Sequence, residues 1–171
     1  TPDHLDRYDG FTGYCASKER LFSFQHQDQL AIIACDDDPS RMISSRINHR
    51  LNRVHASDVT DQSQWPTLQG PHNAQNVAIA VSVAQALGID AATIERGLAT
   101  YPGLPHRMER IRELDGVLYV NDSKATNATS AAPALGAYPA IHWILGGQAK
   151  TDDLDARAPS FSHVKAAHTS G

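Results

Sequence analysis

Apolar residues follow two different patterns along the chain, and the alternation of these patterns predicts an α/β protein. Short, mainly apolar runs, typical of buried strands, occupy residues 30–35 and 141–145. Residues 14–27 contain neither Pro nor Gly and favour a helix. Residues 73–87 repeat apolar side chains at helical spacing and are followed by Gly88, where a helix stop is expected. Helices and strands are therefore expected to succeed one another along the chain.

The other segments before residue 100 carry weaker signals. Asp90 can cap a helix over residues 91–99, which would turn Ile94 and Leu98 inward. The acidic stretch DDDPS follows the first apolar run and is interpreted as a turn. Residues 40–66 are polar and weakly patterned, so we expect only short strands there.

A stretch rich in proline and glycine, YPGLPHR, divides the chain into two predicted domains. We place the boundary near Leu104, which gives one domain over residues 1–103 and another over residues 104–171. The two strand candidates that follow are joined by Asp115 and Gly116, a strong signal for a two-residue hairpin turn.

The second domain continues in the order expected of an α/β nucleotide-binding domain. Residues 126–137 are small and rich in alanine, which predicts a helix with Pro133 either in its first turn or breaking it. The strand over residues 141–145 then ends at Gly146 and Gly147. Another strand could begin in the final stretch, HVKAAHTSG, so this domain looks cut short.

Composition and charge describe an ordinary folded protein and exclude several classes of function. Of 171 residues, 41% are hydrophobic and 20% are charged, and the net charge is −4. This charge gives no electrostatic case for binding nucleic acid or an anionic membrane. No apolar run approaches the ~20 residues of a membrane span. Cys15 and Cys35 fit no metal-binding or redox spacing, so we expect two free thiols in a reducing cytoplasm.

The most informative candidate site is the sequence NDSKATN, which directly follows the predicted strand VLYV. Ligands of open α/β sheets bind beyond the carboxyl ends of the strands, and the next helix presents free N–H groups to anions. Asp122 could therefore bind a ribose hydroxyl pair, and Lys124 could neutralise a phosphate or carboxylate. Thr126 and Asn127 could cap the helix or contact the ligand. The alternative is structural, with a turn at Asp122, a cap at Thr126 and a solvated Lys124.

Two further motifs have a similar character. GGQAK follows a predicted strand, and its glycines would let a ligand approach the backbone just before Lys150. GPHNAQN places Asn73 and Asn76 three residues apart at the start of a helix, where two amides on one face could contact a base edge. Asn73 is equally suited to a helix N-cap. His106 and Arg107 could form a phosphate clamp or a polar hinge.

Taken in order, the segments DHLDRY…ASK, GPHNAQN, GLPHRME, NDSKATN and GGQAK resemble the Mur ligase family of bacterial peptidoglycan synthesis. The resemblance runs from Thr1 to about Asp153, and NDSKATN after GLPHR is most similar to the members that add D-glutamate. It implies an α/β fold in which residues 1–103 are the C-terminal part of a P-loop-type central ATPase domain. Residues 104–171 would be the first half of a Rossmann-like C-terminal domain.

The same resemblance implies roles for single residues. His4 resembles the histidine near the metal and the acyl phosphate, and Lys18 resembles the lysine whose carbamate helps to hold Mg²⁺. A carbamate offers the oxygen ligand that Mg²⁺ prefers. As isolated residues, both fit an ordinary protein surface. Lys124 would complete the catalytic set.

The remaining implied roles concern nucleotide and substrate. Four residues resemble contacts to the adenine nucleotide, with the arginine reaching it from across the domain boundary: Asn73, Asn76, Arg107 and Asp122. Thr126 resembles a loop residue near D-glutamate, and Lys150 resembles the lysine that pairs with a D-glutamate carboxylate.

The implied activity is ATP-dependent formation of an amide bond between UDP-N-acetylmuramoyl-L-alanine and D-glutamate, through an acyl phosphate. ATP and Mg²⁺ are the implied cofactors. The complete protein is expected to act in the bacterial cytoplasm as a monomer, without binding nucleic acid or a membrane.

The chain also departs from the family pattern. It contains no G-x-x-x-x-G-K-[ST] sequence, so the loop that would surround the phosphates is absent. We therefore expect part of a ligase that does not turn over alone. Two alternatives stay open: a sibling ligase that adds another amino acid, and a free-standing module that binds adenine nucleotide. A purely structural α/β domain would bind neither nucleotide nor D-glutamate.

Overall fold

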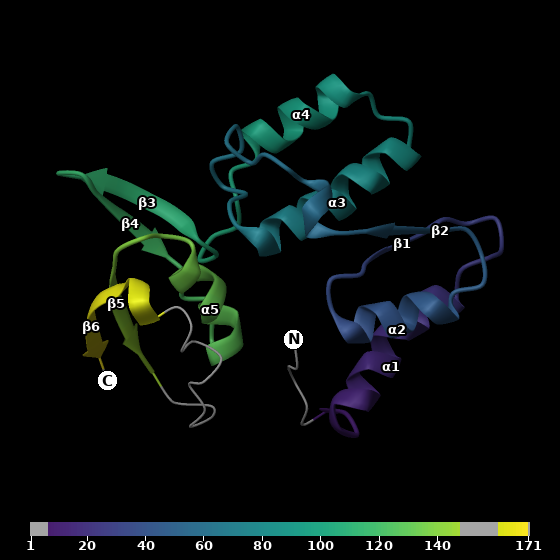
Figure 1. Cartoon of the computed structure of the whole chain (residues 1–171), viewed down its shortest axis with the longest axis horizontal. Helices are drawn as coiled ribbons and strands as arrows, with labels where there is room; N and C mark the ends of the chain where they lie inside the picture. Colours follow the sequence, from purple (N-terminus) through teal and green to yellow (C-terminus); the bar gives the residue numbers. More distant parts are fainter. Residues whose placement is uncertain (1–6, 148–160, 171) are drawn as a thin grey trace. The chain divides into compact units, whose positions relative to one another are not determined.

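The computed structural model describes residues 7–147 and 161–170, and the chain divides into two compact units between Thr100 and Tyr101 (Figure 1). We call residues 1–100 the first unit and residues 101–171 the second unit. The division lies a few residues before the boundary predicted at Leu104. Among the described residues, no helix is both long and apolar enough to cross a membrane.

The first unit is built on a βαβ segment. In chain order its elements are α1 (Gly10–Ser23), β1 (Ala31–Ala34), α2 (Asp38–Arg46), β2 (Leu51–Val54), the 3₁₀ helix η2 (Ala56–Asp58), α3 (Pro71–Ala86) and α4 (Ala91–Thr100). β1 and β2 pair in parallel, with Ala31 opposite Leu51 and Ala34 opposite Val54. α2 makes the crossover between them, as parallel strands require.

Side chains of β1 alternate between two helical layers, because successive residues of a strand point to opposite faces. Ile33 packs with Ile43 of α2 in one buried cluster. Ala34 packs with Val54 of β2 and Ala78 of α3 in another. Figure 1 accordingly shows α1 and α2 on one side of the strands and α3 on the other. The apolar run predicted as a strand is therefore covered on both faces.

The predicted end of α3 and the predicted start of α4 are confirmed. Gly88 has a φ of 77°, and the amide of Ile89 donates to the carbonyl oxygen of Ala84 at 3.0 Å, as in a Schellman motif. The carboxylate of Asp90 accepts a hydrogen bond from the Thr93 amide at 2.9 Å and so caps α4. The two half-buried apolar side chains of α4 are those predicted to face inward, Ile94 and Leu98.

Two predictions for the first unit were wrong in detail. α1 begins and ends several residues earlier than the predicted 14–27. Residues 40–66 contain most of α2 and all of η2, not only short strands. α2 begins inside DDDPS because the Asp37 side chain accepts a hydrogen bond from the Ser40 amide at 2.8 Å. The acidic stretch is therefore a helix cap with proline in the first turn.

In the part of the second unit that the structure describes, the strands form two separate pairs. Its elements are β3 (Glu109–Leu114), β4 (Val117–Asn121), α5 (Ala128–Gly136), β5 (Ile141–Gly146) and β6 (Val164–Ser170). β3 and β4 form the predicted antiparallel hairpin, in which Leu114 lies opposite Val117. Asp115 and Gly116 have φ values of 51° and 76°, the conformation of a type I′ turn.

The strands of the second unit do not join in the way the sequence suggested. β5 pairs in parallel with β6 in one two-stranded sheet, and β4 pairs with β3 in another. Within the described residues, β4 and β5 are therefore not strands of one open sheet. Pro133 lies inside α5, beyond its first turn, and α5 continues to Gly136. The prediction that Pro133 lies in the first turn or breaks the helix was wrong.

Candidate functional site

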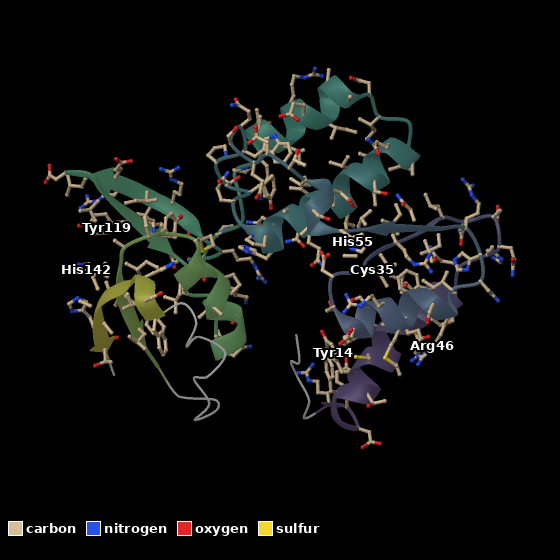
Figure 2. The ribbon with its side chains drawn as sticks, viewed as in Figure 1. Tyr14, Cys35, Arg46, His55, Tyr119 and His142 are labelled. Carbon is tan, nitrogen blue, oxygen red and sulfur yellow. The ribbon has the colours of Figure 1, made fainter. Side chains whose placement is uncertain are left out.

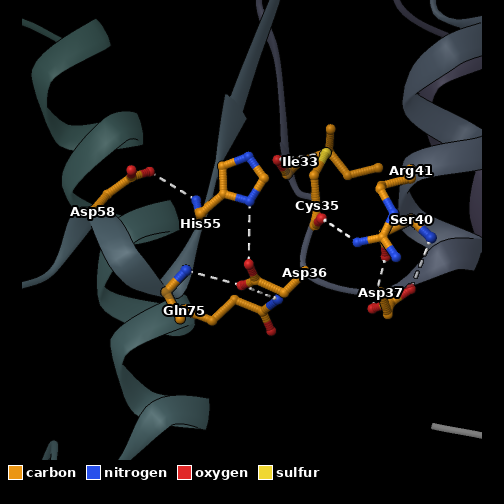
Figure 3. Close-up of polar contacts among 10 residues, drawn as sticks. Ile33, Cys35, Asp36, Asp37, Ser40, Arg41, His55, Asp58 and Gln75 are labelled. Atoms are coloured by element: carbon orange, nitrogen blue, oxygen red, sulfur yellow. Dashed lines mark hydrogen bonds and ion pairs between the residues drawn. The ribbon is translucent and has the colours of Figure 1, made fainter.

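Polar side chains gather where β1 and β2 end in the first unit. Asp36 lies two residues after the end of β1, and His55 directly follows β2. Asp36 Oδ1 lies 3.1 Å from His55 Nδ1. Its Oδ2 accepts hydrogen bonds from the Ala56 amide and from Gln75 Nε2, both at 2.9 Å. Figure 2 marks Cys35 and His55 at this edge, and Figure 3 shows the cluster around Asp36.

These contacts set the ionisation of Asp36. Burial alone would raise the pKa of its carboxyl group. The hydrogen bonds from Ala56, His55 and Gln75, together with the attraction of His55, outweigh that effect and hold the pKa below its ordinary value. The carboxylate is therefore kept ionised and is anchored by three segments of the chain.

Asn73 and Asn76, the two residues predicted to contact the nucleotide, lie on the first two turns of α3. In sequence they flank Gln75, which belongs to the Asp36 cluster. Asn73 is half-buried and its Nδ2 donates to the carbonyl oxygen of Gln69 at 3.1 Å, whereas Asn76 is exposed. The prediction of an N-cap at Asn73 was wrong, because Gly70 holds that position with a φ of 90°. The structure thus leaves Asn73 inside the helix.

Of the two residues predicted to bind the metal, the structure describes only Lys18. His4 lies outside the described residues. Lys18 is exposed on α1, and its Nζ lies 5.2 Å from the ring centroid of Tyr14, one turn earlier. The described part of the chain contains no group of three His, Cys, Asp or Glu side chains that could hold a metal ion.

In the second unit, the segment before β3 is tied to the loop after β4. The His106 amide donates to Glu109 Oε2 at 2.8 Å, and Asn121 Nδ2 lies 2.8 Å from His106 Nδ1. The Lys124 amide donates to the carbonyl oxygen of His106 at 3.0 Å. His106 and Met108 both have positive φ values, 63° and 49°, which non-glycine residues seldom adopt. These contacts hold an uncommon backbone conformation in place.

This arrangement brings three predicted site residues into one region. Asp122 Oδ1 accepts a hydrogen bond from the Met108 amide at 3.0 Å. Arg107, which precedes Met108 in the chain, is exposed. Lys124 follows in the same turn with an exposed side chain. An acceptor and two cations thus lie on joined segments, a combination suited to a ligand with both hydroxyl groups and negative charge.

Asn127 and Thr126, at the end of the predicted loop, differ in role. Asn127 caps α5, because its Oδ1 accepts a hydrogen bond from the Ser130 amide at 2.8 Å. The structural alternative of a cap at Thr126 was therefore wrong. Thr126 is exposed, and its contact with a substrate stays a prediction. Lys150 lies outside the described residues.

The first unit also contains a hollow. A cavity of about 530 Å³ opens between β2, η2, α3 and α4, with Trp65, Val81 and Ile94 among its lining residues. Trp65 Nε1 donates to Glu95 Oε1 at 2.6 Å beside it. None of the predicted site residues that the structure describes lines the cavity, so the polar clusters are the better candidates for chemistry.

Sequence reasoning missed the cluster of Asp36, His55 and Gln75. A signal for Asp36 was present, because it follows a buried strand just as Asp122 follows VLYV. No comparable signal marked Gln75, which approaches Asp36 only when α3 packs on β1.

Comparison with known proteins supports the resemblance found in the sequence. Residues 1–67 match the model of the Mur ligase middle domain. The whole chain is 62% identical to UDP-N-acetylmuramoylalanine–D-glutamate ligase of Sphingopyxis alaskensis and 56% identical to the ligase of the same name from Novosphingobium aromaticivorans. It spans 41% and 40% of the length of these two curated relatives.

Among solved structures, a crystal structure of MurF from Acinetobacter baumannii is similar with a TM-score of 0.70 at 20% identity. The match covers 99% of this chain and 49% of MurF. At this identity the likeness concerns the fold alone, and it shows a Mur ligase-like α/β fold.

Proposed function

We propose that this chain, which belongs to the Mur ligase family, supplies nucleotide- and substrate-binding residues to an ATP-dependent ligase that joins D-glutamate to UDP-N-acetylmuramoyl-L-alanine. The observation that carries the proposal is the 62% identity, along the whole chain, to a D-glutamate ligase. Because the chain spans 41% of that relative, the activity is assigned to the complete protein and not to these residues alone.

In this proposal each unit belongs to one domain of the ligase. The first unit is assigned to the central ATP-binding domain, which its parallel βαβ segment and the family match over residues 1–67 support. The second unit is assigned to the Rossmann-like C-terminal domain, for which the parallel pair β5 and β6 is the supporting feature. The bacterial cytoplasm is the proposed location, and a monomer is the proposed state of the complete protein.

The described residues suit an adenine nucleotide in two ways. Asn73 and Asn76 offer amides at the start of α3, which can donate to and accept from a base edge. The carboxylate of Asp122 is oriented by the Met108 amide and can accept hydrogen bonds from ribose hydroxyl groups. ATP, when bound, would supply the phosphoryl group that activates the alanyl carboxylate.

The cationic residues are proposed to bind the negatively charged groups of nucleotide and substrate. Arg107 and Lys124 are exposed and would bind phosphate or carboxylate oxygens, which lowers the cost of bringing anions together. Thr126 and Lys150 are proposed to bind D-glutamate. Magnesium enters only through the family resemblance, with His4 and a carbamate on Lys18 as its proposed ligands. The described residues alone provide no such ligand set.

The test uses the complete protein encoded by the gene. It is incubated with ATP, Mg²⁺ and UDP-N-acetylmuramoyl-L-alanine, and phosphate release and product mass are measured with D-glutamate, L-glutamate or L-alanine. We expect turnover with D-glutamate alone. Turnover only with another amino acid would identify a sibling ligase. Binding of ADP without turnover would identify a nucleotide-binding module and overturn the proposal.

A further inference from the structure

We propose that Asp36 is a positioning residue, which fastens the start of α3 to the ends of β1 and β2 and so sets the direction of Asn73 and Asn76. The inference rests on the proposed function, because it assumes that these two asparagines contact the nucleotide. In this proposal Asp36 does not contact the nucleotide.

The first step is the geometry of the anchor. Gln75 Nε2 donates to Asp36 Oδ2 at 2.9 Å, across 39 positions of sequence. The same oxygen accepts the Ala56 amide at 2.9 Å, and His55 Nδ1 lies 3.1 Å from Oδ1. One carboxylate thus joins the segments that follow β1 and β2 to the second turn of α3 (Figure 3). Hydrogen bonds to a charged acceptor are among the stronger ones in proteins.

The second step is that, within the described residues, the start of α3 has no local side-chain cap. Its N-cap is Gly70, which has no side chain to accept a hydrogen bond from the first turn. The Gly70 carbonyl oxygen accepts a hydrogen bond from Gln62 Nε2 at 3.1 Å, which holds the loop but does not cap the free N–H groups of the helix. The contacts of Gln62 and of Asn73 Nδ2 with carbonyl groups at residues 69–70 hold the first turn to its own loop. Gln75 adds the hydrogen bond that ties this end of α3 to the segment after β1.

The third step is the rest of the contact between α3 and the sheet. Gln75, Ala78 and Ser82 follow helical spacing along one face of α3. Ala78 packs in the buried cluster with Ala34, and Asn52 Nδ2 donates to Ser82 Oγ at 2.7 Å. Ala74 and Val77 bury the core-facing side of the first two turns, so loss of the Asp36 contact should not detach α3. It should change the orientation of the turns that carry Asn73 and Asn76 more than that of the far end.

The experiment measures nucleotide affinity in the complete protein. We compare Asp36→Asn, Gln75→Met and Ser82→Ala, with kcat, KM for ATP and for D-glutamate, the Kd of ADP and the melting temperature as readouts. Gln75→Met should raise KM for ATP and Kd for ADP about tenfold, with KM for D-glutamate within about twofold. Asp36→Asn keeps an oxygen that can accept from Gln75 but removes the negative charge, so it should raise KM for ATP and Kd for ADP by a smaller factor. Ser82→Ala is the matched control, because it removes a polar contact of the same helix at the other end.

A double variant tests the contact itself. Gln75→Glu alone sets two carboxylates against each other, whereas Asp36→Asn combined with Gln75→Glu exchanges donor and acceptor. We expect the double variant to bind ADP more tightly than either single variant, by about threefold or more. Additive losses in the double variant would overturn the proposed contact.

Asn76→Ala separates this inference from the proposed function. If Asn76→Ala leaves the Kd of ADP unchanged, the nucleotide role of Asn76 is wrong and the positioning role has no target, whereas the proposed ligase function is decided separately by turnover with D-glutamate. If Asn76→Ala weakens ADP binding while Asp36→Asn and Gln75→Met do not, only the positioning role is wrong. Equal loss of ADP affinity in Ser82→Ala would mean that general destabilisation, not positioning, explains the effect.

Discussion

The backbone amide of Lys124 donates a hydrogen bond to the carbonyl oxygen of His106 at 3.0 Å. This bond joins the loop after β4 to the segment that leads into β3, so that two motifs separated in sequence form one structure. The Met108 amide adds a second link by donating to Asp122 Oδ1 at 3.0 Å. Arg107 is held between the two linked positions, His106 and Met108.

The link through Asp122 predicts that its structural and functional roles can be separated. Asp122→Asn keeps an oxygen for the Met108 amide but removes the negative charge, so the melting temperature should change little. If Asp122 binds ribose, KM for ATP should still rise about tenfold. Asp122→Ala should lower the melting temperature as well, because the Met108 amide then loses this acceptor. Unchanged KM for ATP in both variants would assign Asp122 to structure alone.

Substitutions at Asn127 and at Thr126 are predicted to have different effects, the first on stability and the second on substrate binding. Asn127→Ala removes the cap of α5 and should lower the free energy of unfolding by about 1 kcal/mol. Asn127→Ser should retain most of the cap. Thr126→Ala should leave stability unchanged and raise KM for D-glutamate in the complete protein. Urea unfolding and steady-state kinetics measure the two effects, and a stability loss in Thr126→Ala would speak against this division.

The lowered pKa of Asp36 predicts a pH-dependent contribution to stability. Because the pKa in the folded state lies below the unfolded value of 3.8, the contribution is present above that value and is lost as pH falls through the folded pKa. The difference in urea midpoint between the wild type and Asp36→Asn should therefore be larger at about pH 7 than at about pH 3. A ¹³C titration of the aspartate carboxyl groups should place Asp36 below 3.8, and a value above 3.8 would contradict the assignment.

Two glycines are predicted to respond in opposite ways to the same substitution. Gly116 in the hairpin turn has a φ of 76°, and the described residues leave open the space that a Cβ atom would occupy. Gly116→Ala should therefore cost about 1 kcal/mol through backbone conformation alone. Gly97 lies inside α4 with similar open space, and Gly97→Ala should stabilise by about 0.5–1 kcal/mol. Thermal unfolding followed by circular dichroism measures both, and effects of the same sign would refute the explanation.

Signals confined to a few neighbouring residues were sufficient for much of the fold. Gly88 and Asp90 marked the end of one helix and the start of the next, and Asp115 with Gly116 marked the hairpin. Each feature depends on backbone conformation or on a hydrogen bond a few positions away, which the sequence contains directly. The same kind of signal at Asp37 was misinterpreted, because an acidic residue before proline suits both a turn and a helix cap.

Contacts between distant segments decided the rest. The motif NDSKATN pointed to Asp122 as a site residue, but only the pairing of β3 with β4 places the Met108 amide against its carboxylate. Asp36 meets Gln75 only because Ala34 and Ala78 pack together and bring α3 onto β1. The hydrogen-bond partners of a side chain depend on strand register and on helix packing, and these arise from the burial of apolar surface across the whole unit.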